Sequence, residues 1–174
     1  MATYIALLRG INVSGKNKIL MTDLKQILQE LKLKDVITYI QSGNVIFKSD
    51  ELAINLSKTI SAKILETFNY NIPVFILNKK ELQHIYNNNP FVNNNVEFKK
   101  LYFCFINKTP INTIALSNYN IKNDQYKITN KVLYLKYENG AGKTKLTNKL
   151  IENKLQVIAT SRNYKTITKL LELT

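Results

Sequence analysis

Residues 36–48 read Val36-Ile37-Thr38-Tyr39-Ile40-Gln41-Ser42-Gly43-Asn44-Val45-Ile46-Phe47-Lys48. β-Branched and aromatic residues fill both ends of this stretch, and Ser42-Gly43 interrupts it with two residue types that are common in turns. Two such runs separated by two turn residues are typical of a β-hairpin. We therefore predict strands over 36–41 and 44–48, and this hairpin is the centre of the predicted fold.

The elements on either side of the hairpin complete a β-α-β-β-α-β order. They are a strand, a helix, a second helix and a strand, predicted at residues 3–8, 23–31, 50–68 and 73–77. Both helices carry apolar residues three or four apart. Asp50 is predicted to cap the second helix, and Pro73 favours an edge position for the strand that it begins. This order is that of a ferredoxin-like unit.

The second half of the chain is predicted to repeat the same order. Its strands and helices are predicted at residues 99–106, 110–116, 125–129, 131–137, 145–155, 157–160 and 164–173. The sequence therefore predicts an α+β fold of two ferredoxin-like units in tandem, with a C-terminal helix added. The first subdomain is predicted at 1–78, a connecting helix and Asn-rich loop at 79–97, and the second subdomain with the terminal helix at 98–174.

The composition is that of an ordinary folded domain and disfavours several classes of protein. Of the 174 residues, 45% are hydrophobic and 21% are charged. We see neither a signal peptide nor the roughly 20 consecutive apolar residues of a membrane span. The single cysteine, Cys104, excludes an intramolecular disulfide, and the single histidine, His84, disfavours a zinc site. We expect a cytoplasmic protein with no metal, no cofactor and no membrane partner.

The formal net charge of +13 indicates a polyanionic partner such as nucleic acid. The same excess follows from a drift towards lysine in a Lys-, Asn- and Ile-rich chain, and we weigh that interpretation more heavily. On the predicted second sheet, Tyr102 and Tyr134 flanked by lysines resemble the base-stacking surface of RNA-binding sheets. No stretch matches the aromatic consensus of that class, so we favour packing of these tyrosines against the sheet of the first unit or against a dimer partner.

All but two of the 25 basic residues are lysines. The exceptions are Arg9, within the motif 9–18, and Arg162, within the motif 161–165. Arginine presents a planar fork of donors that lysine cannot imitate, and this fork binds carboxylates and phosphates through two parallel hydrogen bonds. The two arginines therefore indicate where directional contacts to an anion are needed.

The predicted topology brings the first of these motifs beside the hairpin. The loop after the first strand and the turn between the second and third strands leave the sheet at the same end, and glycines let backbone N–H groups point at an anion. The start of the following helix adds the positive end of a dipole. We therefore predict an anion site made by Arg9, Gly10, Asn12, Lys16, Asn17, Lys18, Gln41, Ser42, Asn44, Arg162 and Asn163.

Structural roles are the alternative for these residues. The loop residues would then cap turns and bridge the two halves of the chain. Arg162 either completes the same pocket or forms a salt bridge that ties the last helix to the body. Asn163 is also predicted to cap that helix.

A second glycine-rich loop, Asn139–Thr144, runs from a predicted strand into a predicted helix. It is not a P-loop, because Tyr137 stands where that motif needs its first glycine. Thr144 is a candidate helix cap, and Lys143, Lys145 and Lys149 form a basic helix face. No paired carboxylates, metal cluster or Ser-His-Asp set is evident, so the catalytic residues are unknown.

Four motifs carry a resemblance to a known family. They are Tyr4–Val13, Lys16–Lys18, Thr38–Val45 and Ala159–Asn163. Together they closely resemble the bacterial family catalogued as domain of unknown function 1697, nearly from end to end. Ser14 stands where that family usually has glycine, and Tyr164 where it usually has tryptophan. The resemblance implies an intracellular α+β protein and implies no particular reaction.

Our leading hypothesis is a protein that binds a phosphate-bearing or otherwise anionic ligand, with Arg9 making the bidentate contact. One alternative is nonspecific nucleic-acid binding, and another is phosphoryl-transfer or nucleotide chemistry at the same site. A fourth possibility is an interaction protein that uses the second sheet. The sequence leaves the ligand and the oligomeric state open.

Overall fold

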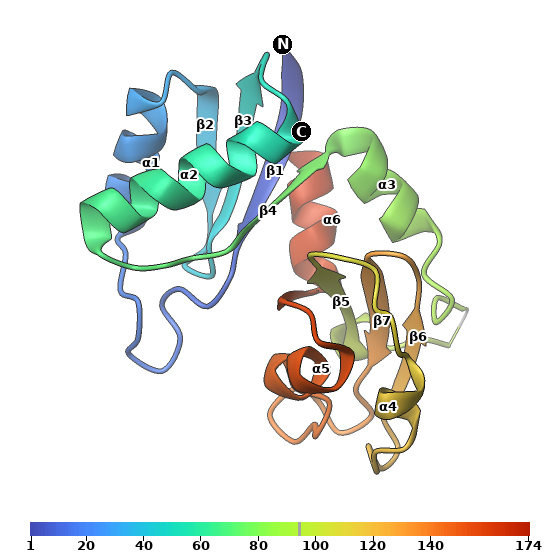
Figure 1. The fold of residues 1–174 in the computed structure, drawn as a ribbon. Coiled ribbons are helices and arrows are strands. Elements are labelled where there is room, and N and C mark those ends of the chain that lie inside the picture. Colours follow the sequence, from blue (N-terminus) through green and yellow to red (C-terminus); the bar gives the residue numbers. More distant parts are fainter. Residues whose placement is uncertain (94) are drawn as a thin grey trace. The chain divides into compact units, whose positions relative to one another are not determined.

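The computed structural model of this protein describes residues 1–93 and 95–174, which form two compact units. The first unit comprises Met1–His84 with Leu170–Thr174, and the second comprises Ile85–Lys169. Each contains one four-stranded antiparallel sheet (Figure 1). The predicted α+β class with two ferredoxin-like units and a terminal helix is confirmed.

The predicted subdomain limits at 1–78, 79–97 and 98–174 stay a prediction about which segments fold independently. The Asn-rich loop of that prediction includes residue 94, which lies outside the described residues.

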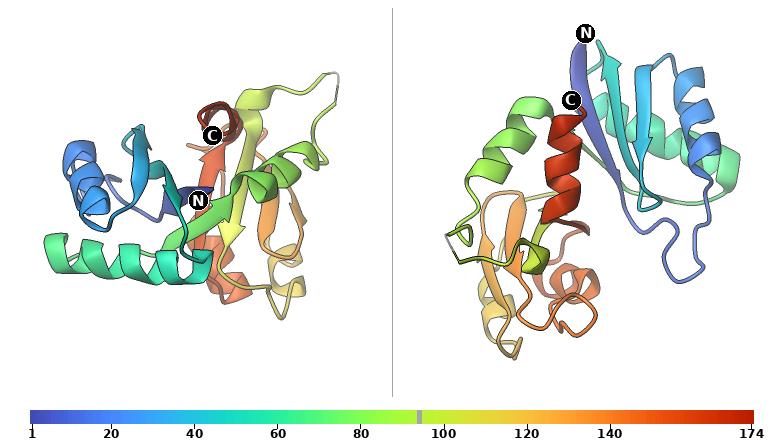
Figure 2. Two further views of the ribbon diagram at one scale, coloured as in Figure 1. Left: turned by 90° about the horizontal axis from the view of Figure 1, so that it is seen from above. Right: turned by 180° about the vertical axis from the view of Figure 1, so that it is seen from behind.

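The first unit has the strand order β2-β3-β1-β4. Its elements are β1 (Ala2–Leu8), α1 (Met21–Glu30), β2 (Lys34–Tyr39), β3 (Asn44–Ser49), α2 (Ala53–Phe68) and β4 (Val74–Asn78), followed by α3 (Lys79–Asn87). Both α1 and α2 lie on one face of the sheet, as the view from behind shows (Figure 2). The central strands β1 and β3 therefore supply the floor of the core, and Pro73 precedes an edge strand as predicted.

The core of the first unit is aliphatic and follows the predicted spacing. Ala6 and Leu8 of β1 face the helices, and Leu56, Ile60 and Ile64 of α2 pack against them at intervals of one helical turn. These side chains are almost fully buried. This packing fixes the direction in which β1 leaves the sheet, and so it positions the loop that follows.

Two local predictions in this unit are wrong. The hairpin turn has four residues, Ile40–Gly43, because Ile40 and Gly43 both adopt left-handed backbone conformations, with φ of 48° and 76°. Asp50 does not cap α2. Its carboxylate pairs with the amino group of Met1 at 2.9 Å, and the residue at the cap position is Leu52.

The second unit repeats the topology with the strand order β6-β7-β5-β8. Its elements are the 3₁₀ helix η1 (Phe98–Lys100), β5 (Leu101–Ile106), α4 (Ile114–Ser117), β6 (Gln125–Ile128), β7 (Val132–Lys136), α5 (Asn148–Leu155), β8 (Ala159–Asn163) and α6 (Tyr164–Glu172). Residues of α4 and α5 pack on the sheet face that carries Cys104 and Leu133.

The strand register of the second sheet separates the two tyrosines that were predicted to form a stacking surface. Phe103 pairs with Tyr134, whereas Tyr102 pairs with Leu135, so the two tyrosines lie on opposite faces. Tyr102 packs against Tyr137 with ring centroids 4.7 Å apart. Tyr134 is 3% exposed, and its hydroxyl donates to the Ile85 carbonyl at 3.0 Å. The register therefore contradicts a shared stacking surface, which the sequence had already disfavoured, and both tyrosines pack within the second unit.

Candidate functional site

The loop after β1 lies against the β2–β3 turn, as the topology predicted. The backbone N–H of Leu8 donates to the Gly43 carbonyl at 2.8 Å, and the side-chain amide of Asn12 donates to the Gln41 carbonyl at 2.9 Å. Gly43 is buried against Leu8 and Ile11, which leaves no room for a larger residue. The two segments that carry most of the predicted site residues are therefore held together.

The loop itself has an unusual backbone. Left-handed conformations occur at Gly10, Asn12, Ser14, Gly15 and Asn17, with φ between 48° and 75°. Glycine adopts this region without strain, and asparagine tolerates it better than most other residues. Ser14 adopts it as well, at the position where the resembling family usually has glycine. The tip is closed by a hydrogen bond of 3.0 Å from the Lys16 N–H to the Val13 carbonyl.

Asparagine side chains fix this backbone. Asn12 donates to the Ile19 and Gln41 carbonyls and accepts a bond from the Ile19 N–H, each at 2.9 Å. Asn17 donates to the Gly10 carbonyl at 3.0 Å. The Asn44 amide, which is fully buried, donates to the Tyr39 carbonyl and to Ser42 Oγ, both at 3.0 Å. These amides brace the loop and the turn, which is the structural role that the sequence left open, and a ligand role for them stays a prediction.

An open hollow of about 570 Å³ lies where the loop meets α1. It is lined by Asn12, Gly15, Lys18, Ile19, Leu20, Met21, Thr22 and Gln41. The predicted site residues that line it are therefore Asn12, Lys18 and Gln41. The remaining ones in this unit, Arg9, Gly10, Lys16, Asn17, Ser42 and Asn44, are outside the lining.

The first turn of α1 forms one wall of the hollow. The helix begins at Met21, and Leu20 at the cap position has an extended backbone and offers no side-chain cap. The first N–H groups of a helix have no partner within it, and they carry the positive end of its dipole. Sequence analysis included the start of this helix in the predicted site but placed it two residues later, at Asp23, and so it missed Leu20, Met21 and Thr22. The four-residue spacing between Leu20 and Leu24 was the signal available, since the Leu24 N–H donates to the Leu20 carbonyl.

The charges around the hollow are of both signs. Lys16 and Lys18 are exposed, and neither makes an ion pair within residues 1–93 and 95–174. Asp23 lies in the first turn of α1, where its carboxylate accepts a bond of 3.1 Å from the Thr22 hydroxyl. A carboxylate there is stabilised by the same helix end that would attract an anion, so the cationic character of the hollow depends on Lys18 and the N–H groups.

The remaining two predicted site residues belong to the second unit. Arg162 lies within β8 and is 6% exposed, and its Nη1 donates to Thr160 Oγ1 and to the Ser161 carbonyl, both at 2.8 Å. Burial lowers the pKa of this guanidinium to about 10, which still leaves it protonated at neutral pH. Asn163 Oδ1 accepts a bond of 2.8 Å from the Thr166 N–H, so its predicted role as the cap of α6 is confirmed. A joint site with Arg9 stays a prediction.

The glycine-rich loop of the second unit is braced by a carboxylate. Asp124 accepts bonds from the Glu138 N–H, at 3.0 Å, and from the Thr144 hydroxyl. Thr144 does not cap α5, contrary to one reading of the sequence, because Thr147 holds that position and accepts from the Leu150 N–H at 3.2 Å. Sequence analysis missed Asp124, since nothing local links it to a threonine 20 residues away.

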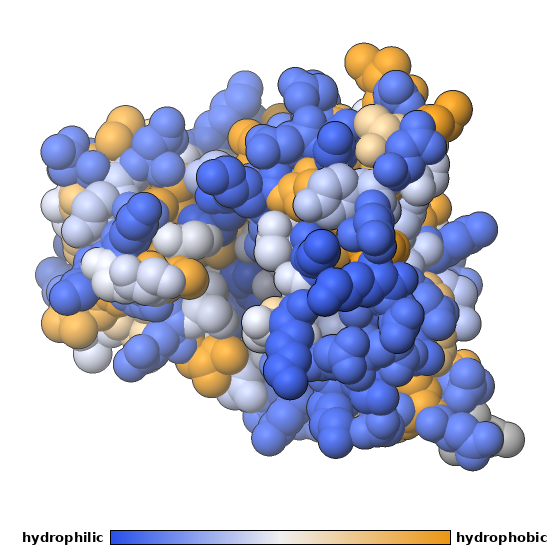
Figure 3. Space-filling model, turned by 90° about the horizontal axis from the view of Figure 1, so that it is seen from below, coloured by the Kyte–Doolittle hydropathy of each residue, from blue (hydrophilic) through white to orange (hydrophobic). Residues whose placement is uncertain are grey.

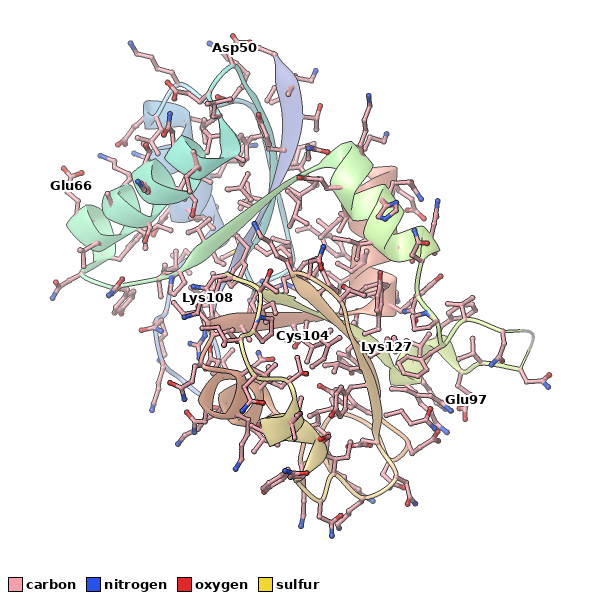
Figure 4. The ribbon with its side chains drawn as sticks, turned by 45° about the vertical axis from the view of Figure 1, so that its right-hand side comes forward. Asp50, Glu66, Glu97, Cys104, Lys108 and Lys127 are labelled. Carbon is pink, nitrogen blue, oxygen red and sulfur yellow. The ribbon has the colours of Figure 1, made fainter. Side chains whose placement is uncertain are left out.

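Groups suited to catalysis are few among the described residues. Cys104 is fully buried in β5 (Figure 4), and burial raises the pKa of its thiol to about 12, which makes it unreactive at neutral pH. No group of three or more His, Cys, Asp and Glu side chains in the described part of the chain could hold a metal ion. None of the helices there is long and apolar enough to cross a membrane.

Comparison with known proteins gave a matching family model and a similar solved structure, among others. Residues 1–134 match the model of the family described as "Protein of unknown function (DUF1697)". The structure of conserved bacterial protein SP0830 from Streptococcus pneumoniae is similar over 98% of this chain and 97% of that chain, with a TM-score of 0.74 and 24% sequence identity. At that identity the likeness supports the fold alone. No curated protein matches the chain.

Proposed function

We propose that this chain, which belongs to the DUF1697 family of proteins of unknown function, binds a small ligand bearing a phosphate or another anionic group in the hollow at the start of α1. The observation that carries the proposal is the uncapped first turn of α1, which opens into that hollow together with Lys18. Helix starts of this kind bind anions through their unpaired N–H groups and the dipole.

The polar and the apolar groups that line the hollow would contact different parts of the ligand. The N–H groups of the first turn and the Lys18 ammonium would hold the anionic group, and the Gln41 side chain would orient it. Leu20 is 68% exposed and, with Met21, offers an apolar surface for an uncharged part of the ligand. The Asn12 bonds keep the loop in one conformation, so binding would lose little entropy.

Arg9 is retained in the proposal as a bidentate contact from the adjoining loop. It is half-buried, and its backbone N–H donates to the Pro73 carbonyl at 3.0 Å, which anchors the start of the loop. Lysine at this position would keep the charge and lose the fork. We expect Arg9→Lys to keep the fold and to weaken ligand binding, and an unchanged affinity would remove Arg9 from the proposed site.

A titration with inorganic phosphate and with a nucleoside monophosphate, followed by amide NMR, tests the site. We expect the Gly15 and Thr22 signals to shift in the parent and to stay in place in Lys18→Gln, because the ammonium is lost. Lys25→Gln is the matched control, since Lys25 lies on α1, is exposed and does not line the hollow. Equal shifts in all three proteins, or no shifts at millimolar ligand in the parent, would contradict the proposal.

A further inference from the structure

The second unit distributes its charges unevenly. Its four acidic residues are Glu97, Asp124, Glu138 and Glu152. Glu97 pairs with Lys99 and Lys100, at 2.9 Å and 2.7 Å, and Glu138 pairs with Lys100 and Lys136, at 3.2 Å and 2.5 Å. The ion pairs of this unit are thus concentrated around η1 and the end of β7.

The other two carboxylates are occupied by hydrogen bonds that hold loops in place. Asp124 binds the Glu138 N–H and the Thr144 hydroxyl, and Glu152 accepts a bond of 2.8 Å from the Ala159 N–H. Both are partly or largely buried. They contribute negative charge below the surface, but neither forms an ion pair with a lysine on the outer side of α5.

Five lysines remain unpaired around α5, and we call them the α5 basic surface. They are Lys122, Lys143, Lys145, Lys149 and Lys154. All are exposed, and none makes an ion pair within the described ranges 1–93 and 95–174. Lys149 projects from the side of α5 opposite the buried Ile151 and Leu155, and Lys154 projects from the flank of the helix.

Two contacts hold this surface in shape. The Asp124–Thr144 bond ties the loop that carries Lys122 to the loop that carries Lys143 and Lys145. The Lys154 ammonium lies over the Tyr119 ring, 5.6 Å from its centroid, which links the end of α5 to the segment after α4. Figure 3 shows hydrophilic side chains gathered over the part of the second unit that these segments form.

We infer that the α5 basic surface binds the phosphodiester backbone of nucleic acid, without reading its sequence. Exposed asparagines interleave with the lysines at positions 118, 120, 139 and 153, and their amides donate hydrogen bonds to phosphate oxygens. Elsewhere in this unit, Lys99, Lys100 and Lys136 are neutralised by Glu97 and Glu138. The exposed lysines at 108, 127, 131 and 165 also make no ion pair among the described residues, but they lie outside the segments that the Asp124 and Lys154 contacts hold together. This function is separate from the proposed ligand site in the first unit.

The test is fluorescence anisotropy with a labelled mixed-sequence duplex of 20 base pairs, at several salt concentrations. If the five lysines each neutralise a phosphate, the logarithm of the binding constant should fall with the logarithm of salt concentration with a slope of about −4.5. Replacing Lys143, Lys145, Lys149 and Lys154 with glutamine should reduce affinity at 50 mM salt by about tenfold or more.

The matched control replaces four exposed lysines of the first unit with glutamine: Lys25, Lys32, Lys58 and Lys80. It removes the same charge from positions outside the proposed surface, and we expect it to change affinity by less than about threefold. Equal losses in both variants, or no duplex binding by the parent at 50 mM salt, would overturn the inference. Binding to phosphatidylserine vesicles that exceeds binding to the duplex would overturn it too.

Each of the two proposals can be disproved without affecting the other. Lys18→Gln should leave duplex binding unchanged, and the fourfold lysine variant should leave the phosphate-induced NMR shifts of Gly15 and Thr22 unchanged. Circular dichroism spectra of every variant check that the fold is kept.

Discussion

The two ferredoxin-like units share a strand order but brace their main loops with different chemical groups. In the first unit, the neutral amide of Asn12 joins the loop after β1 to the β2–β3 turn. In the second unit, the carboxylate of Asp124 joins the loop before α5 to the loop before β6. Both residues satisfy backbone groups that would otherwise lack partners.

The charge of the bracing group determines which charged groups near each loop remain available to bind an anion. An amide brace adds no charge, so the first loop presents a shaped hollow in which Lys18 and a helix start supply the positive potential. A carboxylate that is occupied as a brace is withdrawn from ion pairing, so the lysines around it stay unpaired. Under the two proposals, the same fold would support a site for a small anion in one unit and an extended basic surface in the other.

The largest expected loss of stability comes from replacing a glycine of the packed β2–β3 turn, in contrast to a glycine of the open loop before α5. Gly43→Ala would place a Cβ 2.7 Å from Leu8 Cβ and 2.8 Å from Ile11 Cδ1, in a left-handed conformation. We expect a loss of about 3 kcal/mol in the free energy of unfolding, from overpacking and backbone strain together. Urea denaturation measures it.

Gly140→Ala is the matched control in the second unit, because Gly140 has a similar φ of 79° and nothing lies within 4 Å of the added methyl. We expect only the backbone cost, about 1 kcal/mol. Equal losses in the two variants would show that the contacts of 2.7 Å and 2.8 Å at Gly43 add no packing cost.

The sequence predicted the topology because the information for it is local. The alternation of 3–8, the apolar spacing of α2 and the turn residues of the hairpin each act within a few residues. The element order then leaves few possible arrangements, so the loop after β1 was correctly predicted to lie beside Gln41.

What the sequence could not supply depends on long-range pairing or on competition for a partner. Asp50 resembles a helix cap, but its carboxylate pairs with the amino group of Met1. A stacking surface of Tyr102 and Tyr134 could be weighed from the sequence only without the register, which places them on opposite faces. Asn12 was expected to contact a ligand, and its bonds to Ile19 and Gln41 become visible only when the loop is folded.

Removing each brace should have an effect no larger than that of Gly43→Ala, and it tests the comparison directly. Asn12→Ala loses three hydrogen bonds and puts alanine in a left-handed conformation, so we expect a loss of about 3 kcal/mol. Asp124→Asn cannot accept the Thr144 hydroxyl bond in the same geometry, and we expect a loss of about 1–2 kcal/mol. Urea denaturation compares both with the parent.

Only the second change should alter duplex binding. Asp124→Asn removes a negative charge beneath the α5 basic surface, so affinity for the duplex should rise, whereas Asn12→Ala should leave it unchanged. Asn12→Gly serves as a control, since glycine keeps the left-handed backbone and isolates the cost of the lost bonds. A rise in duplex affinity in Asn12→Ala would mean that the two loops are not independent.

The smallest effect concerns the paired lysines, which contrast with the unpaired ones of the α5 basic surface. Hydrogen bonds from Lys100 and Lys99 lower the pKa of the Glu97 carboxyl from 4.5 to about 2. A carboxyl with a lowered pKa in the folded state stabilises the protein above its unfolded pKa, and that contribution disappears as the pH falls from about 4.5 towards 2. Glu97→Gln should therefore flatten the acid limb of a plot of urea midpoint against pH.

Lys145→Gln is the control and should leave that limb unchanged, because Lys145 has no carboxylate partner among the described residues. Because Glu97 is exposed, salt should shrink the difference between the parent and Glu97→Gln, and a difference that persists in 1 M salt would mean that Glu97 acts through something other than these ion pairs.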